Sequence, residues 1–184
     1  MEIVNRDNSR SIVYRDVFSD VDFDVLKGEI DWQVEKVLVY GKWHEPYRLR
    51  SGQGESSYSY SGNVVEGLTW STTVKSIKAE LEHLYGAKVS YVLCNYYPDG
   101  TSHLGYHSDN EKDLAPNASI YSVYFGASRK FYLKHTDGTR YDTVLNHGDV
   151  LIMEGETQRH FKHTVPKEMK VKLPRINLTF RLMK

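Results

Sequence analysis

The stretch from Asn95 to Glu111 reads N-Y-Y-P-D-G-T-S-H-L-G-Y-H-S-D-N-E, and in it one residue separates His107 from Asp109. In an extended chain alternate side chains point to the same face, so this imidazole and this carboxylate would project together while the serine between them points away. Such a pair supplies two of the three ligands of a 2-His-1-carboxylate triad, which holds Fe(II) and leaves one side of the metal open. The third ligand has to come from elsewhere, and His163 is the best candidate.

Two other histidines compete with His163 for the third position. His160 precedes it by three residues, and His103 precedes His107 by four. If residues 159–165 form a strand, His160 points to the face opposite His163. An H-x-D pair on its own also fits a surface loop, so the metal hypothesis depends on this distant third ligand.

The composition indicates one folded domain without a global attraction for nucleic acid. The 184 residues are enough for one domain, and a hydrophobic share of 40% argues against disorder. Lys and Arg together number 24, as do Asp and Glu, so any contact with nucleic acid must come from a local positive patch.

The chain has one cysteine, Cys94, in an apolar V-L-C run, which excludes an internal disulfide and predicts a buried, inert thiol. No apolar run approaches the length of a membrane span, and Met1-Glu2-Ile3 does not begin a secretory signal. We therefore expect a soluble intracellular protein with no membrane partner, acting as a monomer.

Short strand-like segments with turns between them make up most of the chain. A strand over 89–97 ends at a Pro98-Asp99-Gly100 turn, and an apolar stripe followed by Gly86 predicts a helix over 72–85. The strand-like segments that follow are 106–109, 119–125, 130–134, 143–145, 150–153, 161–165 and 176–182. Many short strands with regular turns indicate a sandwich or barrel. The predicted fold class is mainly β with flanking helices (α+β), a jelly-roll sandwich in a single domain.

The chain before the helix at 72–85 is expected to be less regular. Residues 1–30 are predicted to be an N-terminal extension with a short helix from Ser19 to Leu26, ahead of a domain over 31–184. Strands are expected over 34–40 and 56–61, with a polar loop over 44–54 between them.

Three motifs in a fixed order resemble those of the AlkB family of Fe(II)/2-oxoglutarate dioxygenases. They are the H-x-D at His107, the H-T-V-P that begins at His163, and the run R-I-N-L-T-F-R from Arg175 to Arg181. The resemblance extends from about Gly41 to Arg181 and is tightest in N-Y-Y-P-D-G through H-S-D-N-E, then F-G-A-S-R-K-F, then H-G-D-V-L-I-M. It implies a double-stranded β-helix and the use of Fe(II), 2-oxoglutarate and O2.

The resemblance also implies a role for each matching residue. His107, Asp109 and His163 would hold Fe(II). Arg175 would bind the distal carboxylate of 2-oxoglutarate, which suits the planar fork of a guanidinium. Arg181 would lie near the keto-acid end and the metal. The remaining residues expected at the cosubstrate are Asn95 and Tyr97, which match a hydrogen-bonding N-x-Y pair, and Asn177, which falls on the same strand face as both arginines.

The family reaction oxidises 2-oxoglutarate to succinate and carbon dioxide and hydroxylates a methyl group on a base nitrogen, after which formaldehyde leaves the restored base. Family substrates are N1-methyladenine and N3-methylcytosine in DNA or RNA, which implies methylated nucleic acid as the partner. One alternative is a hydroxylase of a protein or small molecule with the same iron site. Another is a non-catalytic jelly-roll binding module.

The expected substrate contacts lie in a nucleotide-recognition lid at about 38–62 and beside the H-x-D. Tyr58 and Tyr60 match an aromatic pair of the lid, and Glu111 matches an acidic residue that reads the base. The run V-Y-G-K-W resembles the V-F-G-K-W of a duplex-repairing branch, which places Tyr40 at the tip of a finger inserted into the base stack. Tyr40 could instead end a buried strand. The stretch 47–55 departs from the family, with R-S-G-Q-G-E where an aromatic is common.

Overall fold

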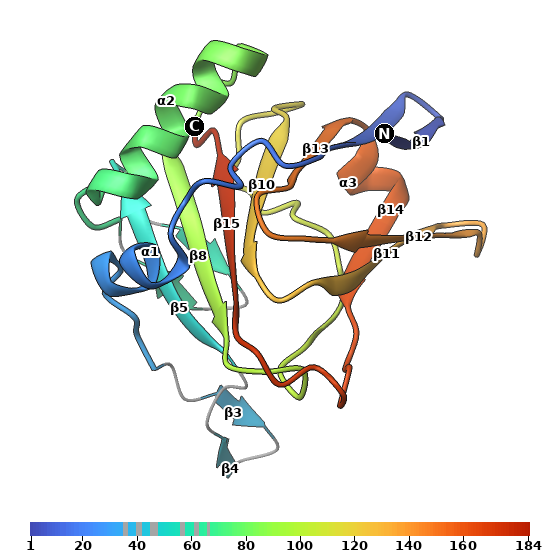
Figure 1. Cartoon of the computed structure of the whole chain (residues 1–184). Helices are drawn as coiled ribbons and strands as arrows, with labels where there is room; N and C mark the ends of the chain where they lie inside the picture. Colours follow the sequence, from blue (N-terminus) through green and yellow to red (C-terminus); the bar gives the residue numbers. More distant parts are fainter. Residues whose placement is uncertain (35–36, 40–41, 45–47, 56–57, 61–62, 66) are drawn as a thin grey trace.

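The computed structural model of the chain describes residues 1–34, 37–39, 42–44, 48–55, 58–60, 63–65 and 67–184, with only the backbone course given for the strands within 37–44 and 58–65. Two antiparallel sheets form a sandwich, and two helices cover one outer face of it (Figure 1). The predicted mainly β sandwich with flanking helices is thereby confirmed.

The strands of the two sheets come from distant parts of the chain. The larger sheet has seven strands in the order β1 (Glu2–Arg6), β2 (Ser9–Tyr14), β13 (Val150–Gly155), β10 (Ile120–Gly126), β15 (Arg175–Arg181), β8 (Tyr91–Tyr97) and β5 (Leu49–Gly54). The smaller sheet has four strands in the order β12 (Arg140–Leu145), β11 (Arg129–His135), β14 (Phe161–Val165) and β9 (Leu104–His107). Two hairpins stand apart, β3 (Val37–Val39) with β4 (Lys42–His44), and β6 (Tyr58–Tyr60) with β7 (Asn63–Val65).

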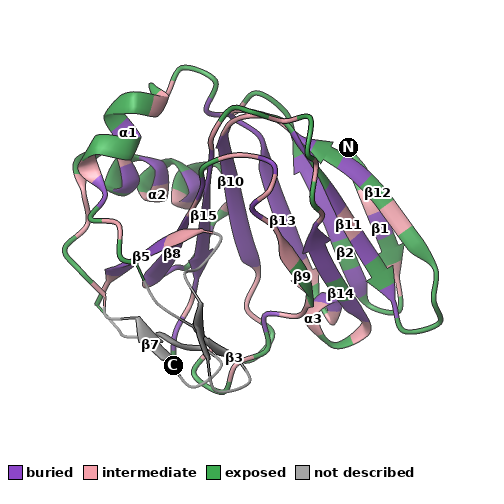
Figure 2. Cartoon of the chain, turned by 90° about the horizontal axis from the view of Figure 1, so that it is seen from below, coloured by how far each residue is buried: buried purple, intermediate pink, exposed green. Residues whose placement is uncertain are grey.

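A buried apolar core lies between the two sheets. Val13, Tyr124 and Leu151 contribute from the larger sheet, and Phe131 and Phe161 from the smaller one, each at most 4% exposed. Burying side chains of this size contributes roughly 1.5–3 kcal/mol each. Buried residues accordingly run along the strands of both layers (Figure 2).

A second core lies between the larger sheet and the helices α1 (Phe23–Glu29) and α2 (Thr72–Tyr85). The helix predicted over 72–85 matches α2, and Gly86 ends it in the left-handed conformation, with φ of 61°. The fully buried side chains of this layer include Leu26, Val74, Leu81, Ile176, Leu178 and Phe180. The third helix is the single turn α3 (Thr157–His160), which leads directly into β14.

The N-terminal residues are part of the larger sheet, where the sequence predicted an extension. β1 and β2 form a hairpin, and β2 pairs with β13 from Val150↔Tyr14 to Gly155↔Ser9. The turn uses Asp7 and Asn8 with φ of 50° and 55°, a left-handed pair that lacks the glycine usual in such turns. The short helix was also misplaced, because Asp22 and not Ser19 accepts the first helical N–H groups.

The polar stretch predicted as a loop over 44–54 contains β5, the strand at the other edge of the larger sheet. Its side chains do not alternate between apolar and polar, because Arg50, Ser51 and Gln53 are all buried. Backbone pairing with β8 holds it in place, from Leu49↔Tyr96 to Gly54↔Tyr91. Gly54 permits the close approach, since a Cβ there would lie 2.4 Å from the Ser90 carbonyl oxygen.

Cys94 is buried within β8, as predicted, and burial raises the pKa of its thiol. In the described part of the chain, no helix is long and apolar enough to cross a membrane.

Candidate metal and cosubstrate site

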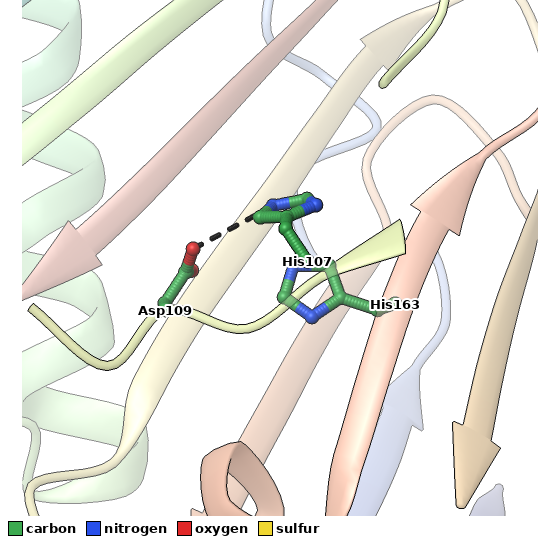
Figure 3. Close-up of side chains that lie close together, drawn as sticks. All are labelled: His107, Asp109 and His163. Carbon is green, nitrogen blue, oxygen red and sulfur yellow. Dashed lines mark ion pairs between the residues drawn. The ribbon is translucent and has the colours of Figure 1, made fainter. Parts of the chain in front are cut away.

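The three residues predicted to hold a metal lie together at the end of the β9–β14 pair (Figure 3). His107 ends β9 and is the cross-strand partner of His163 in β14, with ring centroids 4.2 Å apart. Asp109 follows two residues later, beyond the strand that was expected to include it. One ligand atom from each side chain falls within 4.8 Å of the other two, which is a spacing that one metal ion can bridge.

The carboxylate of Asp109 is charged and oriented. Its Oδ2 accepts a hydrogen bond from Nη2 of Arg181 at 2.9 Å, and both residues are at most 5% exposed. Burial would raise the pKa of Asp109, but Arg181, with His163 and His107, holds this pKa well below its ordinary value. The other oxygen, Oδ1, lies 3.6 Å from Nε2 of His107, on the side where the ligand atoms meet.

The two imidazoles suit a metal as neutral nitrogen donors. Burial lowers the pKa of His163 to about 4, so this ring is neutral near pH 7. Nδ1 of His107 lies 2.9 Å from the Gly105 carbonyl oxygen, and a hydrogen bond donated there leaves the lone pair on Nε2. Two neutral imidazoles and one carboxylate are the donor set of non-haem Fe(II) oxygenases, so the residues fit the ion.

His160 does not join this group. It is the last residue of α3, and its ring stacks on His135 at a centroid distance of 6.0 Å. We expected His160 to point away from His163 because both would lie on one strand. The strand begins only at Phe161, so His160 is separated from the ligands by its place in α3 instead. Nδ1 of His103 lies 3.2 Å from the Thr101 carbonyl oxygen, and His103 is likewise outside the group of ligand atoms.

A cavity of about 570 Å³, part of it open to solvent, extends from the three ligands toward the larger sheet. All of the residues that the sequence placed at the metal and the cosubstrate line it, namely Asn95, Tyr97, His107, Asp109, His163, Arg175, Asn177 and Arg181. The two sheets therefore bring these eight positions to a single cavity.

Arg175 is a buried cation that forms no ion pair with a carboxylate in the described part of the chain. It is 1% exposed, and its guanidinium lies over the rings of Tyr97 and Tyr124 at 5.1 and 4.7 Å. Its Nε and Nη1 have no hydrogen-bond partner among the described residues, and burial lowers its pKa. A desolvated guanidinium needs an anion, and the distal carboxylate of a dicarboxylate would supply two acceptor oxygens.

The neighbouring amides are held by the protein itself. Asn95 accepts a hydrogen bond from Nε of Arg48 at 3.0 Å. Asn177 donates to the Val123 carbonyl at 3.4 Å and accepts from Oγ1 of Thr179 at 3.0 Å. These bonds fix the side chain of Asn177 within the larger sheet, and its expected place at the cosubstrate stays a prediction.

Two lining residues, Arg48 and Tyr124, were missed by sequence reasoning. Arg48 lies within the stretch predicted as a loop over 44–54, so nothing suggested that it faces Asn95. Tyr124 is one of several aromatics in β10, and only its pairing with Asn177 across the sheet places it over Arg175. A strand register for β10 and β15 would have been needed to find it.

Of the four residues expected to contact the substrate, only Glu111 has a described side chain. Glu111 lines a separate cavity on the other side of the H-x-D segment, which it shares with Ser108 and Asp109. Tyr58 and Tyr60 lie in β6, inside the strand predicted over 56–61, but their side chains are outside the described residues. Tyr40 is outside the described residues altogether.

Arg129, to which the sequence assigned no role, supports the Arg175 end of the cavity. It is 1% exposed, and its Nε binds Glu168 at 3.0 Å. Its Nη2 donates to the carbonyls of Ser102 and Pro166 at 2.9 and 2.7 Å, and its Nη1 to that of Asp99 at 3.3 Å. One guanidinium thus joins the turn after β8 to the loop after β14.

Comparisons with known proteins agree with this site. The model of the 2OG-Fe(II) oxygenase superfamily matches residues 20–181. The human protein named DNA oxidative demethylase ALKBH2 is 34% identical over 189 residues, covering 95% of this chain and 72% of its own length. The bovine alpha-ketoglutarate-dependent dioxygenase alkB homolog 3 is 33% identical over 174 residues, covering 89% of this chain and 61% of its own. A solved structure of OsALKBH1 shares the fold, with a TM-score of 0.62 at 18% identity over 99% of this chain and 100% of that one.

The fold, the donor set and the matching relatives define the protein as an Fe(II)/2-oxoglutarate-dependent dioxygenase, with O2 as the oxidant. Within that superfamily the chain belongs to the AlkB family, which confirms the resemblance seen in the motifs.

Replacing Arg129 by methionine tests whether its guanidinium holds the turn after β8 against the loop after β14. The change leaves Glu168 and three carbonyl groups without their cation, and removing one partner of a buried pair costs about 3–5 kcal/mol. We expect a loss of this size in the free energy of unfolding, measured by urea denaturation. Lys130→Met, at the exposed neighbouring position, is the control. Equal stability of the two variants would show that Arg129 does not hold the loops.

Proposed function

We propose that this chain oxidatively demethylates N1-methyladenine and N3-methylcytosine in nucleic acid, with release of formaldehyde. The observation that carries the proposal is the opening of His107, Asp109, His163 and Arg175 into one cavity, where Nε and Nη1 of Arg175 have no hydrogen-bond partner among the described residues. In this arrangement a metal ion and a dicarboxylate can bind next to each other. The similarity to proteins named DNA oxidative demethylases favours a methylated base as the substrate.

Each residue has a definite task in this proposal. His107, Asp109 and His163 hold Fe(II), and Arg175 binds the distal carboxylate of 2-oxoglutarate. Arg181 keeps Asp109 ionised and turned toward the metal. Tyr97 packs on the Arg175 guanidinium and limits its movement. When bound, Fe(II) and 2-oxoglutarate supply the activation of dioxygen that hydroxylates the methyl group.

The substrate side of the proposal rests on charge and stacking. The methylated bases are cationic, so the Glu111 carboxylate and the aromatic rings of Tyr58 and Tyr60 would favour them over neutral bases. Methylation at these nitrogens also blocks pairing, so such a base leaves the stack more readily than an intact one. Beside β14, a surface hollow lined by Lys134 and Lys162 contains no acidic side chain among its described residues, and it provides a local positive patch for phosphates.

The metal ligands are tested with two histidine variants. His163→Ala should abolish Fe(II) binding and 2-oxoglutarate turnover, because it removes one of three ligands. His160→Ala is the control and should retain both. Anaerobic Fe(II) titration and succinate release are the measurements. Loss of Fe(II) binding in the His160 variant, with full binding in the His163 variant, would show that the wrong histidine had been assigned.

The cosubstrate anchor is tested with Arg175→Met. Charge-assisted hydrogen bonds contribute about 1.5–3 kcal/mol each, so 2-oxoglutarate affinity should fall by at least about tenfold, while Fe(II) affinity changes little. Calorimetric titration of each ligand separates the two effects. Arg140→Met, an exposed arginine of β12, is the matched control. An unchanged 2-oxoglutarate affinity would place the distal carboxylate elsewhere.

Mass spectrometry of methylated single- and double-stranded DNA and RNA, after incubation with Fe(II), 2-oxoglutarate and ascorbate, tests the reaction itself. We expect loss of the methyl group with matching succinate release. Tyr58→Ala and Tyr60→Ala should each weaken demethylation by roughly 1–3 kcal/mol of stacking free energy and leave uncoupled 2-oxoglutarate turnover intact. If 2-oxoglutarate is consumed and no oligonucleotide is demethylated, the enzyme hydroxylates a protein or small molecule instead.

A further inference from the structure

The segment that carries His163 also holds the segment that carries Asp109. The backbone N–H of Asp109 donates to Oε1 of Gln158, on α3, at 2.9 Å. The hydroxyl of Ser108 donates to the carbonyl of Phe161, the first residue of β14, at 2.8 Å. Both contacts lie within five residues of His163, which itself pairs with His107, so residues 158–163 touch the H-x-D segment at three points.

These contacts replace the sheet pairing that Asp109 lacks. The register of β9 with β14 includes His163↔His107 and Val165↔Leu104, with an irregularity between them, and the strand ends at His107. Beyond that point no strand pairing with β14 fixes the backbone of Asp109. Its carboxylate is bound to Arg181, so Gln158 and Arg181 restrain the residue from its backbone and its side chain respectively.

Gln158 is itself fixed by the core. Its Nε2 donates to the sulfur of Met153 at 3.4 Å, and Met153, on β13, is 3% exposed within the core between the sheets. Both ends of the amide are therefore engaged, and its oxygen is aimed at the Asp109 N–H. The contacts run from the packed core through one side chain to the carboxylate of the metal site.

We infer that Gln158 is a positioning residue for the iron site, with Ser108 assisting it, and that its amide oxygen sets the metal affinity by holding Asp109 in place. The inference rests on the metal ligands proposed above. Neither side chain is among the grouped ligand atoms, so the effect passes through Asp109. Residues that orient metal ligands commonly change metal affinity by 10–100-fold when replaced.

The test is a titration of the metal-free protein with Co(II), whose visible absorption reports the number and arrangement of its ligands. Gln158→Leu keeps the size of the side chain and removes the acceptor. It should weaken Co(II) binding by about 10–100-fold and change the absorption spectrum. Gln158→Glu keeps an oxygen facing the Asp109 N–H and should restore affinity close to that of the wild type.

Arg159→Leu, one residue further along α3, is the matched control, because the Arg159 side chain is 76% exposed and pairs with Glu156. It should bind Co(II) like the wild type, and the metal-free melting temperatures of the Arg159 and Gln158 variants should agree. Wild-type Co(II) affinity in Gln158→Leu would overturn the inference. An equal loss in Gln158→Glu would also overturn it, since packing and not the acceptor would then be responsible.

Variants at two further positions, Ser108 and Asp109, keep the test decisive. If Gln158→Leu does not fold, the comparison of Ser108→Ala with Ser108→Thr replaces it, and wild-type Co(II) affinity in Ser108→Ala would reject the inference. Asp109→Asn separates this outcome from a failure of the proposed ligand set. If that variant binds Co(II) as tightly as the wild type, the ligand assignment is wrong, whatever Gln158 does.

Discussion

The buried ion pair between Arg181 and Asp109 connects the two sheets at the metal site. Arg181 ends β15 of the larger sheet, and Asp109 follows β9 of the smaller one. Desolvation offsets much of the attraction in a buried pair, so a gain in stability is not its main consequence. Its consequence is orientation, because Oδ2 is bound to Arg181 and Oδ1 is left facing His107. The site therefore presents a fixed negative charge beside the imidazoles of His107 and His163 before any cation binds.

The strand β15 explains why helices cover the outer face of the larger sheet. Its alternate residues Arg175, Asn177 and Arg181 line the cavity, which removes apolar side chains from that part of the inner core. The residues between them, Ile176, Leu178 and Phe180, point to the other face and are fully buried against the helices. One face of β15 thus lines the polar cavity, and its other face packs against the helices. A sandwich without α1 and α2 would leave these apolar side chains in water.

The sequence predicted the structure well where residues have a characteristic chemistry or where apolar residues recur with the period of a strand or helix. The H-x-D, His163 and the R-I-N-L-T-F-R run predicted residues that line one cavity, and the three expected metal ligands lie together there. It missed β1, β2 and β5, which backbone pairing holds in the sheet without a clear apolar period. Tyr124 and Gln158 could not be found either, because their roles depend on a strand register and on the placement of α3. His163 does lie with His107 and Asp109, as predicted. His160 is excluded because it belongs to α3, and not because it points to the opposite face of one strand.

The departure from the family pattern at residues 47–55 lies largely in a strand of the larger sheet and not in a loop. Most of that stretch is β5, whose Ser51 and Gln53 are buried in the larger sheet, and Arg48 beside it binds Asn95 at the cavity. Substitutions there act on the edge of the sheet and on the part of the cavity that Asn95 lines. The hairpins β3–β4 and β6–β7 pair with neither of the two sheets among the described residues. Because His107 and His163 lie on paired strands of the smaller sheet and Gln158 of α3 binds the Asp109 backbone, substitutions in these hairpins should leave the arrangement of the three ligands in place.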